Sequence, residues 1–231
     1  SNFISRIRKE EGGWHEDLQE IKDSAISFFS DLFASNRQVQ ALTELPFEVP
    51  RATQEDNEIM KRLPTMEEIH EVVFGMEIQS APGPDGFGAG FFQSCWDIVK
   101  DDLLMAIQDF FQGMEQPRSW SHSMVVLIPK VEGASHWRDF RPISLCNVTS
   151  KVVSKILAIR ISKLLPKLIS PWQTGFVPGR GIVDNVLLAQ ELILDLDRRL
   201  IDPNLILKLD MEKAYDRVDW SFLLFLLRQY G

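Results

Sequence analysis

The residues with the clearest capacity for chemistry lie in one short stretch near the end of the chain, residues 205–216. Its apolar part, 205–209, ends in the carboxylate of Asp210, and Tyr215 and Asp216 follow. A short apolar run that begins after a Pro-Asn pair is typical of a buried strand. A carboxylate at the end of such a strand can hold a metal ion on a rigid scaffold. We therefore predict a buried strand over 205–209 that presents Asp210 as a candidate metal ligand. From these residues alone, a cap or turn explains Asp210 equally well, and a core position explains Tyr215 better.

The chemistry that such a carboxylate could serve sets demands on the rest of the chain. Nucleotide transfer by two Mg²⁺ ions needs the ions roughly 3.5–4 Å apart, and Mg²⁺ prefers oxygen ligands from several carboxylates. A triphosphate also needs Lys or Arg on the side opposite the metals. A nucleic-acid strand needs a basic groove that carries aromatic side chains. Asp210 by itself meets only the first part of these demands.

Positive charge is concentrated in the second half of the chain, although the formal net charge of the whole chain is −8. Residues 1–119 carry 10 Lys and Arg against 22 Asp and Glu, whereas residues 120–231 carry 15 against 11. A local basic stripe is what a phosphate-bearing partner requires, but a solvated helix face also explains the charges along residues 151–167. Between Trp120 and Gly181 the basic residues are Lys130, Arg138, Arg141, Lys151, Lys155, Arg160, Lys163, Lys167 and Arg180.

Composition and cysteine usage exclude several protein classes. The 231 residues are 45% hydrophobic and 25% charged, which is ordinary globular composition. We find no apolar stretch that resembles a secretory signal peptide or a membrane span. Cys95 and Cys146 lack metal-type spacing, so we expect two reduced structural thiols. These features predict an intracellular protein that is not secreted.

Hydrophobic periodicity and cap residues predict a helix-rich chain with few strands. Apolar residues recur at helical spacing over residues 21–33, 66–76, 96–110, 148–166, 182–196 and 220–229. Thr65 is expected to cap the second of these helices and Asp219 the last, and the fourth is expected to stop near Pro166. Strands are predicted over 124–129 and 205–209, with a linker over 34–61. Because two isolated strands do not make a finished sheet, we expect further strands of the fold beyond Gly231.

Five short motifs follow one another along residues 81–216. They are Ala81-Pro82-Gly83-Pro84-Asp85-Gly86-Phe87, Val126-Leu127-Ile128-Pro129-Lys130, Phe140-Arg141-Pro142-Ile143-Ser144-Leu145, Gln173-Thr174-Gly175-Phe176-Val177-Pro178-Gly179-Arg180 with Asp184-Asn185, and Lys208-Leu209-Asp210-Met211-Glu212-Lys213-Ala214-Tyr215-Asp216. In this order the motifs resemble those of the reverse transcriptase of a non-LTR, LINE-type retrotransposon, particularly the plant kind. They are more distantly similar to those of group II intron maturases. Each motif alone would be weak, whereas the order of all five is specific.

The resemblance, which covers roughly residues 62–231, implies a fold and a division of the chain. The implied fold class is α+β and helix-rich, with the fingers and an incomplete palm of a right-hand, reverse-transcriptase-like polymerase. Residues 1–61 would form a helical N-terminal extension and linker. Residues 62–203 would form the fingers-like region, and residues 204–231 the first palm strand and helix.

The resemblance also implies a role for each motif residue. Asp210 would be the first catalytic Asp, which ligates both Mg²⁺ ions, and Tyr215 would lie under the incoming sugar. Lys130 and Arg141 would approach the template and the nucleotide triphosphate. Without the resemblance, Arg141 would be a surface salt-bridge residue and the Pro-Gly-Pro-Asp-Gly stretch an ordinary turn. The expected nucleic-acid contacts are Gly83, Asp85 and Gly86 of the first motif and Arg180 of the fourth, together with Lys151 and Lys155 of the basic stretch, which belong to no motif. The expected structural supports are Gln173, Gly175, Phe176 and Asp216, and Arg180 also lies in the loop that would brace fingers against palm.

The activity that the resemblance implies is RNA-templated DNA synthesis in the nucleus or cytoplasm. The implied partners are an RNA template, a DNA primer and deoxynucleoside triphosphates, with no membrane. The family carries two further catalytic acids in an aromatic-x-Asp-Asp hairpin, which these 231 residues do not contain. We therefore expect the missing palm and thumb segments in a longer parent protein, and we expect this chain alone to be inactive and to hold Mg²⁺ poorly. The alternative is a non-catalytic RNA- or DNA-binding remnant of a decayed element, and a plain helical interaction domain would require the motif order to be accidental.

Overall fold

The computed structural model describes residues 3–34, 45, 47–194, 205–209 and 218–231. These residues form an α+β arrangement of helices and two small antiparallel sheets. The chain divides into two compact units. The first unit contains residues 1–34 and 61–158, and the second contains residues 35–60 and 159–231.

The first unit begins with a short hairpin and a helix. Strands β1 (Ile7–Arg8) and β2 (Trp14–His15) pair antiparallel, and helix α1 (Leu18–Phe33) follows. Asp17 caps α1, because its carboxylate accepts hydrogen bonds from two backbone N–H groups of the first turn.

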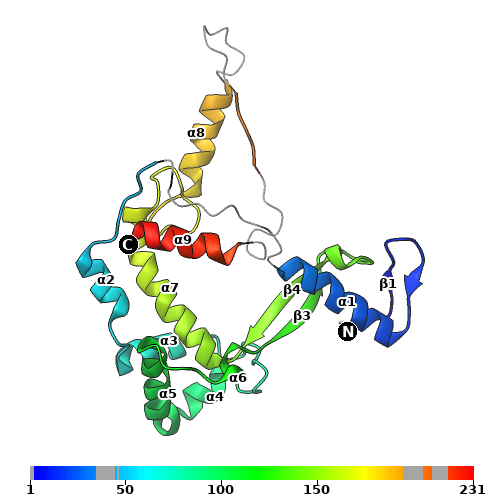
Figure 1. Cartoon of the computed structure of the whole chain (residues 1–231), viewed down its shortest axis with the longest axis horizontal. Helices are drawn as coiled ribbons and strands as arrows, with labels where there is room; N and C mark the ends of the chain where they lie inside the picture. Colours follow the sequence, from blue (N-terminus) through cyan, green and yellow to red (C-terminus); the bar gives the residue numbers. More distant parts are fainter. Residues whose placement is uncertain (1–2, 35–44, 46, 195–204, 210–217) are drawn as a thin grey trace. The chain divides into compact units, whose positions relative to one another are not determined.

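A longer hairpin lies beside α1 in the same unit (Figure 1). Strands β3 (Ser123–Pro129) and β4 (Phe140–Cys146) pair antiparallel along their whole length. A short 3-10 helix, η1 (Trp137–Asp139), precedes β4, and its Trp137 indole donates to the hydroxyl of Ser24 in α1 at 3.3 Å. The apolar core that joins α1 to the hairpin consists of Ile7, Ile21, Phe29, Trp137 and Phe140.

The helices α3 (Met66–Phe74), α4 (Ala89–Ser94) and α5 (Trp96–Phe111) pack on one another in the first unit. The Thr65 hydroxyl caps α3 by accepting from the backbone N–H of Glu68 at 3.3 Å. The short α6 (Arg118–Ser121) leads into β3, and α7 (Val148–Leu168) begins two residues after β4. The side chains that these helices bury completely include Ile69, Val73, Ile107, Val148, Val152 and Ile156.

The second unit contains α2 (Gln54–Lys61), the second half of α7, α8 (Ile182–Leu194) and α9 (Trp220–Tyr230). Asp219 caps α9 by accepting from the N–H of Phe222 at 2.8 Å. Neither α8 nor α9 has a fully buried residue among those described. No described helix is both long enough and apolar enough to cross a membrane.

Most of the predicted helices are confirmed. The two predicted caps, Thr65 and Asp219, act as expected. The predicted strand over 124–129 is confirmed as β3, and Cys95 and Cys146 are free thiols. The helix expected to stop near Pro166 ends two residues beyond it, at Leu168. Pro166 lies in the last turn of α7, where it removes a single hydrogen bond.

The prediction of a linker over residues 34–61 was wrong for its last part, because residues 54–61 form α2. The start of α2 is fixed by a reciprocal pair of hydrogen bonds. The Thr53 hydroxyl accepts from the N–H of Asp56 at 3.2 Å, and the Asp56 carboxylate accepts from the N–H of Thr53 at 3.0 Å. This capping box lies in the sequence as Thr-x-x-Asp. The polar composition of the helix hid it from a search for apolar periodicity.

The predicted strand over 205–209 was also wrong. These residues have no regular secondary structure, and Leu205, Leu207 and Leu209 are 87%, 73% and 79% exposed. A strand is stabilised by a neighbour that accepts its backbone hydrogen bonds, and no described strand pairs with this segment. The strand that does pair with β3 is β4, which periodicity did not reveal.

Asp56 links the start of α2 to the end of α7 within the second unit. It is 5% exposed, and its carboxylate accepts from the Lys167 ammonium at 2.7 and 3.0 Å. The Thr53 N–H and hydroxyl also donate to it, at 3.0 and 2.9 Å. The bond from Lys167, followed by those from Thr53, lowers the pKa of Asp56 to about 2.

We expect Asp56→Asn to remove a pH-dependent part of the stability. Because the pKa of Asp56 is lowered in the folded state, its stabilisation is fully present above the ordinary carboxyl pKa of about 4 and is lost as the pH falls toward about 2. Thermal unfolding measured from neutral to acid pH should show a lower midpoint for the variant at neutral pH, and a difference that narrows in acid. The exposed neighbour provides a control, since Glu55→Gln should follow the wild type. Parallel curves for the wild type and Asp56→Asn would contradict this account.

Candidate functional site

Lys130 and Arg141, which come from two different motifs, lie at the same end of the β3–β4 hairpin. Lys130 directly follows β3, and its backbone N–H donates to the carbonyl of Asp139 at 2.8 Å. Arg141 is the second residue of β4 and lies opposite Ile128. Both side chains are exposed. The antiparallel register therefore brings two predicted phosphate contacts to one end of the hairpin.

The turn between the two strands is held by Asp139. Its carboxylate accepts from the backbone N–H of His136 at 2.9 Å and from that of Ser135 at 3.1 Å, and these bonds lower the pKa of Asp139. The Lys130 ammonium donates to the Arg138 carbonyl at 2.8 Å, which orients Lys130 along the turn. Arg141, in contrast, makes no hydrogen bond or ion pair with its side chain in the part of the chain that the structure describes. Its guanidinium is a free planar donor on a strand whose backbone is fixed.

Asn147 occupies the junction between the end of β4 and the start of α7. It is 5% exposed. Its Oδ1 accepts from the backbone N–H of Asp85 at 3.3 Å, and its Nδ2 donates to the carbonyl of Ser119 at 3.0 Å. Its own carbonyl accepts from the N–H of Lys151 at 3.1 Å, within the first turn of α7. One buried amide thus joins the hairpin, α6 and the loop of the first motif.

Gly83 is required by this junction. A Cβ at Gly83 would overlap both the side chain and the backbone N of Asn147, as well as the carbonyl carbon of Cys146. Gly86, three residues later, has a φ of 79°, which favours glycine. Between them, Asp85 accepts from the N–H of Phe87 at 3.0 Å with its own carboxylate. The structure therefore gives these three motif residues a role in shaping the loop, and their contact with a template stays a prediction.

Lys151 holds the start of the same loop. Its ammonium donates to the carbonyl of Ala81 at 2.9 Å. Lys155 lies one turn further along α7, is exposed, and makes no hydrogen bond or ion pair with another described residue. Of these two predicted nucleic-acid contacts, Lys155 is the one whose ammonium is entirely available.

Arg180 organises the loop that follows α7. Its guanidinium donates to the backbone carbonyls of Ser170, Gln173, Pro166 and Ile169, at distances of 2.6 to 3.1 Å. Four acceptors nearly exhaust its five donors. Arg180 therefore braces the C-terminal end of α7 and the residues after it. Its predicted contact with nucleic acid would compete with these hydrogen bonds.

The other predicted support residues lie in the loop that Arg180 holds. The Gln173 amide donates to the carbonyl of Gly175 at 3.2 Å. Phe176 has a φ of 63°, an uncommon conformation for a residue with a side chain, and is 88% exposed. The amide of Asn185 donates to the carbonyl of Trp172 at 2.8 Å and so ties the loop to the first turn of α8.

Three of the basic residues between Trp120 and Gly181 are engaged in bonds within the second unit. Arg160 is 4% exposed and donates to the Met60 carbonyl at 3.0 Å. Lys167 pairs with Asp56, and Arg180 braces its loop. We call the remaining basic residues of the stretch the accessible cations; they are Lys130, Arg138, Arg141, Lys151, Lys155 and Lys163. Of these, Lys130 and Lys151 each also donate to one backbone carbonyl.

The predicted catalytic and metal residue, Asp210, lies outside the described residues, as do Tyr215 and Asp216. Among the residues that are described, no group of three or more His, Cys, Asp or Glu side chains could hold a metal ion. The described residues therefore do not fit a Mg²⁺ site by themselves, and the metal role rests on Asp210 as a prediction.

Sequence reasoning missed Asn147, the residue that joins the most elements of the site. Its position was visible, since an Asn directly before a helix is a common cap residue. Its side chain instead binds two segments that are 62 and 28 positions away along the chain. Such long-range partners leave no local pattern.

Comparisons with known proteins show which family the chain is similar to. Residues 128–231 match the family of reverse transcriptases, described as RNA-dependent DNA polymerases. The chain is 33% identical over 229 residues to the transposon TX1 uncharacterized 149 kDa protein of Xenopus laevis. The aligned residues are 99% of this chain and 17% of that protein.

Two further relatives are polyproteins of R2 retrotransposable elements. The Pol polyprotein of element R2DM from Drosophila melanogaster is 30% identical over 156 residues, which is 68% of this chain and 14% of the polyprotein. That of element R2 from Nasonia vitripennis is 31% identical over 151 residues, 65% of this chain and 14% of the polyprotein. The chain thus spans less than a fifth of the length of each relative. A particular likeness to plant elements stays a prediction.

The matched segment begins inside β3 and includes both Lys130 and Arg141, the loop braced by Arg180 and the Asp210 motif. The chain therefore belongs to the reverse transcriptases of non-LTR retrotransposons.

Proposed function

We propose that the protein to which this chain belongs catalyses RNA-templated DNA synthesis, and that this chain supplies the surface that meets the template and the incoming nucleotide. The observation that carries the proposal is the convergence of Lys130 and Arg141 at one end of the β3–β4 hairpin. The two residues come from separate motifs of a reverse-transcriptase segment. Their convergence is what binding of a polyanionic triphosphate needs.

Arg141 is the proposed triphosphate contact. Its guanidinium presents a fork of N–H donors that can engage two phosphate oxygens at once. The side chain stands on β4, whose backbone is paired with β3 throughout. Since it has no partner among the described residues, no internal bond has to break before it binds phosphate. Lys130 adds a second positive charge near the same end of the hairpin, where a template or a nucleotide would pass.

The catalytic acid in this proposal is Asp210, with Tyr215 under the sugar of the incoming nucleotide and Asp216 as a support. Mg²⁺ bound at Asp210 and at acids of the longer protein would neutralise phosphate charge and activate the primer hydroxyl. The chain's own contribution is to hold Lys130 and Arg141 fixed and to shape the loop of Gly83, Asp85 and Gly86 beside the strand to be copied.

The same proposal assigns a part of the polymerase to each region of the chain. Residues 62–203 would act as fingers and 204–231 as the first part of a palm, preceded by an extension over residues 1–61. The RNA template, the DNA primer and deoxynucleoside triphosphates would be the partners, in the nucleus or the cytoplasm. A non-catalytic RNA- or DNA-binding protein is the second candidate, favoured by the accessible cations, which do not depend on Asp210.

Primer extension on an RNA template separates the two candidates. We expect the longer protein to extend a DNA primer with Mg²⁺. We expect these 231 residues alone to extend none, because they lack the two catalytic acids of the aromatic-x-Asp-Asp hairpin. In the longer protein, Arg141→Gln should raise the KM for deoxynucleotides by about tenfold or more, the loss expected for a charge-assisted hydrogen bond. Arg138→Gln, another exposed arginine of the same hairpin, is the matched control and should leave the KM unchanged.

Two results would overturn the proposal. Extension by the 231 residues alone would contradict the inactivity of this chain. A folded longer protein that binds RNA but extends no primer with Mg²⁺ or Mn²⁺ would favour the non-catalytic candidate.

The salt dependence of RNA binding tests which cations meet phosphate. For single-stranded RNA, the logarithm of the binding constant falls with the logarithm of salt concentration by about 0.7 for each phosphate contact. We expect Lys155→Gln to reduce this slope by about 0.7, because Lys155 is an accessible cation. Lys167→Gln, on the same helix, should leave the slope unchanged, because Lys167 is paired with Asp56. Equal effects of the two substitutions, or wild-type binding that is indifferent to salt, would contradict the assignment.

A further inference from the structure

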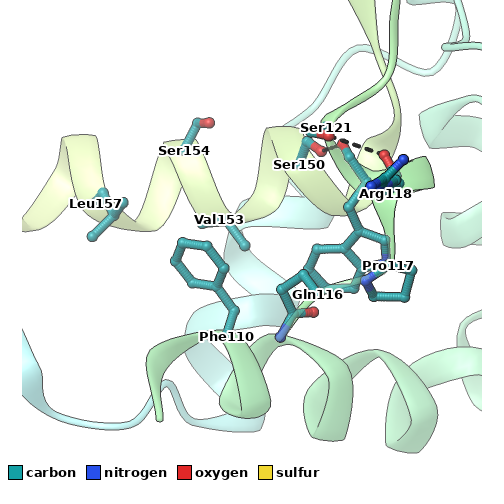
Figure 2. A pocket seen from close by; sticks show the side chains of 10 residues that line it. Phe110, Gln116, Pro117, Arg118, Ser121, Ser150, Val153, Ser154 and Leu157 are labelled. Carbon is teal, nitrogen blue, oxygen red and sulfur yellow. Dashed lines mark hydrogen bonds between the residues drawn. The ribbon is translucent and has the colours of Figure 1, made fainter. Parts of the chain in front are cut away.

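A pocket of about 390 Å³ lies within the first unit, between the last turn of α5, the segment 116–121 that contains α6, and the first half of α7. Figure 2 shows it from close by. Its volume is within the range of sites that bind small molecules. None of the residues that line it has a part in the polymerase chemistry proposed above.

The pocket has an apolar end and a polar end. Phe110, Val153 and Leu157 supply the apolar walls, and Arg118 lies at the end opposite Leu157 (Figure 2). Ser150 lies near Arg118, and Ser150 and Leu157 are two turns apart on α7, which separates them by roughly 10 Å along the helix axis. A ligand that fits this pocket therefore needs an apolar body and a polar group at one end.

The polar end is fixed by hydrogen bonds within the protein. The Ser121 hydroxyl donates to the carbonyl of Arg118 at 2.9 Å, and the Ser150 hydroxyl donates to the carbonyl of Trp120. The Ser150 bond holds α6 against α7, the Ser121 bond lies within α6, and together they use the hydroxyl donors of both serines. The wall that carries Arg118 and Trp120 is therefore formed before any ligand arrives.

Two strong donors among the lining residues remain available. The Arg118 guanidinium and the Trp120 indole N–H make no hydrogen bond, ion pair or ring contact with other residues that the structure describes. The indole ring also faces the pocket as an apolar surface. A cation and an N–H donor that line the same pocket favour an anionic group.

The surroundings limit the ligand to a small molecule. Arg118 is the one charged side chain that lines the pocket. A pocket of about 390 Å³ has room for one small molecule, whose anionic group would pair with Arg118. The aromatic rings of Phe110 and Trp120 favour a planar ring as the apolar body.

We propose that this pocket binds a planar aromatic anion of about the size of a mononucleotide. The ring lies among Phe110, Val153 and Leu157, and the anionic group accepts hydrogen bonds from the Arg118 guanidinium and the Trp120 indole N–H. A purine nucleotide and an aromatic carboxylate share this chemistry. The inference does not depend on the polymerase activity.

The test uses the full 231-residue chain and NMR of its indole N–H groups, with the Trp120 signal assigned from Trp120→Phe. Adenosine 5′-monophosphate, 1-naphthoate and adenosine are titrated separately. We expect at least one of the two anions to shift the Trp120 signal to saturation and adenosine to bind about tenfold more weakly or worse. Arg118→Gln should remove the advantage of the anion, and Arg138→Gln, which changes an exposed arginine outside the pocket, should not.

The relative affinities of the two anions identify the chemical class of the ligand. Tighter binding of the monophosphate assigns a nucleotide, and tighter or equal binding of 1-naphthoate assigns an aromatic carboxylate. The proposal is overturned if neither anion shifts the Trp120 signal, if adenosine binds as tightly as the monophosphate, or if both arginine substitutions weaken binding equally.

Discussion

The buried side chain of Asn147 is the constraint on which the arrangement of the first unit depends. A buried amide that lacks hydrogen-bond partners destabilises a fold by about 1–3 kcal/mol, so its two partners, the N–H of Asp85 and the carbonyl of Ser119, have to stay in place. Gly83 approaches the same side chain so closely that a Cβ would overlap it. The positions of the first-motif loop, α6 and the end of β4 relative to one another are therefore fixed. The hairpin that carries Lys130 and Arg141 is fixed in position with them, because β4 is one of its two strands.

The basic residues illustrate how one chemical type serves two purposes. Arg160, Lys167 and Arg180 all belong to the second unit, and each is committed to carbonyls or to a carboxylate of that unit. The accessible cations lie in the first unit, apart from Lys163. Net charge over a stretch of sequence consequently overstates the charge that a nucleic acid can reach. Geometry separates the cations that build the fold from those that can bind phosphate.

The sequence predicted helices well wherever an amphipathic pattern met a cap residue. Thr65 and Asp219 are the clearest cases, because a cap acts within one turn and leaves a local signature. Strands were harder. β4 contains Pro142 and has few buried residues, which conceals the alternation that identifies a strand. The run 205–209 has the composition of a strand, but strand formation depends on a partner that a local pattern cannot supply.

The candidate site was predictable in its parts and not in its assembly. Motif order identified Lys130 and Arg141, and the antiparallel register that brings them to one end of a hairpin became evident only in the structure. Gly83 packs closely against Asn147 and Gly86 has a positive φ, so both shape the loop, and their expected contact with a template stays a prediction. Asn147, Trp120 and Arg118 have roles set by neighbours far along the chain, so no local pattern marks them.

Hydrogen exchange at the backbone amide of Asp85, measured by NMR in the wild type and in Asn147→Ala, tests the central claim most directly. The account predicts that this amide is protected in the wild type and exchanges about tenfold faster in the variant, as expected for loss of one hydrogen bond. The amide of Gly86, which donates to Gly83 within the loop at 3.0 Å, should change less, and the amides of α5 should keep their protection. An Asp85 amide that exchanges in the folded wild type as fast as in an unstructured peptide would contradict the account.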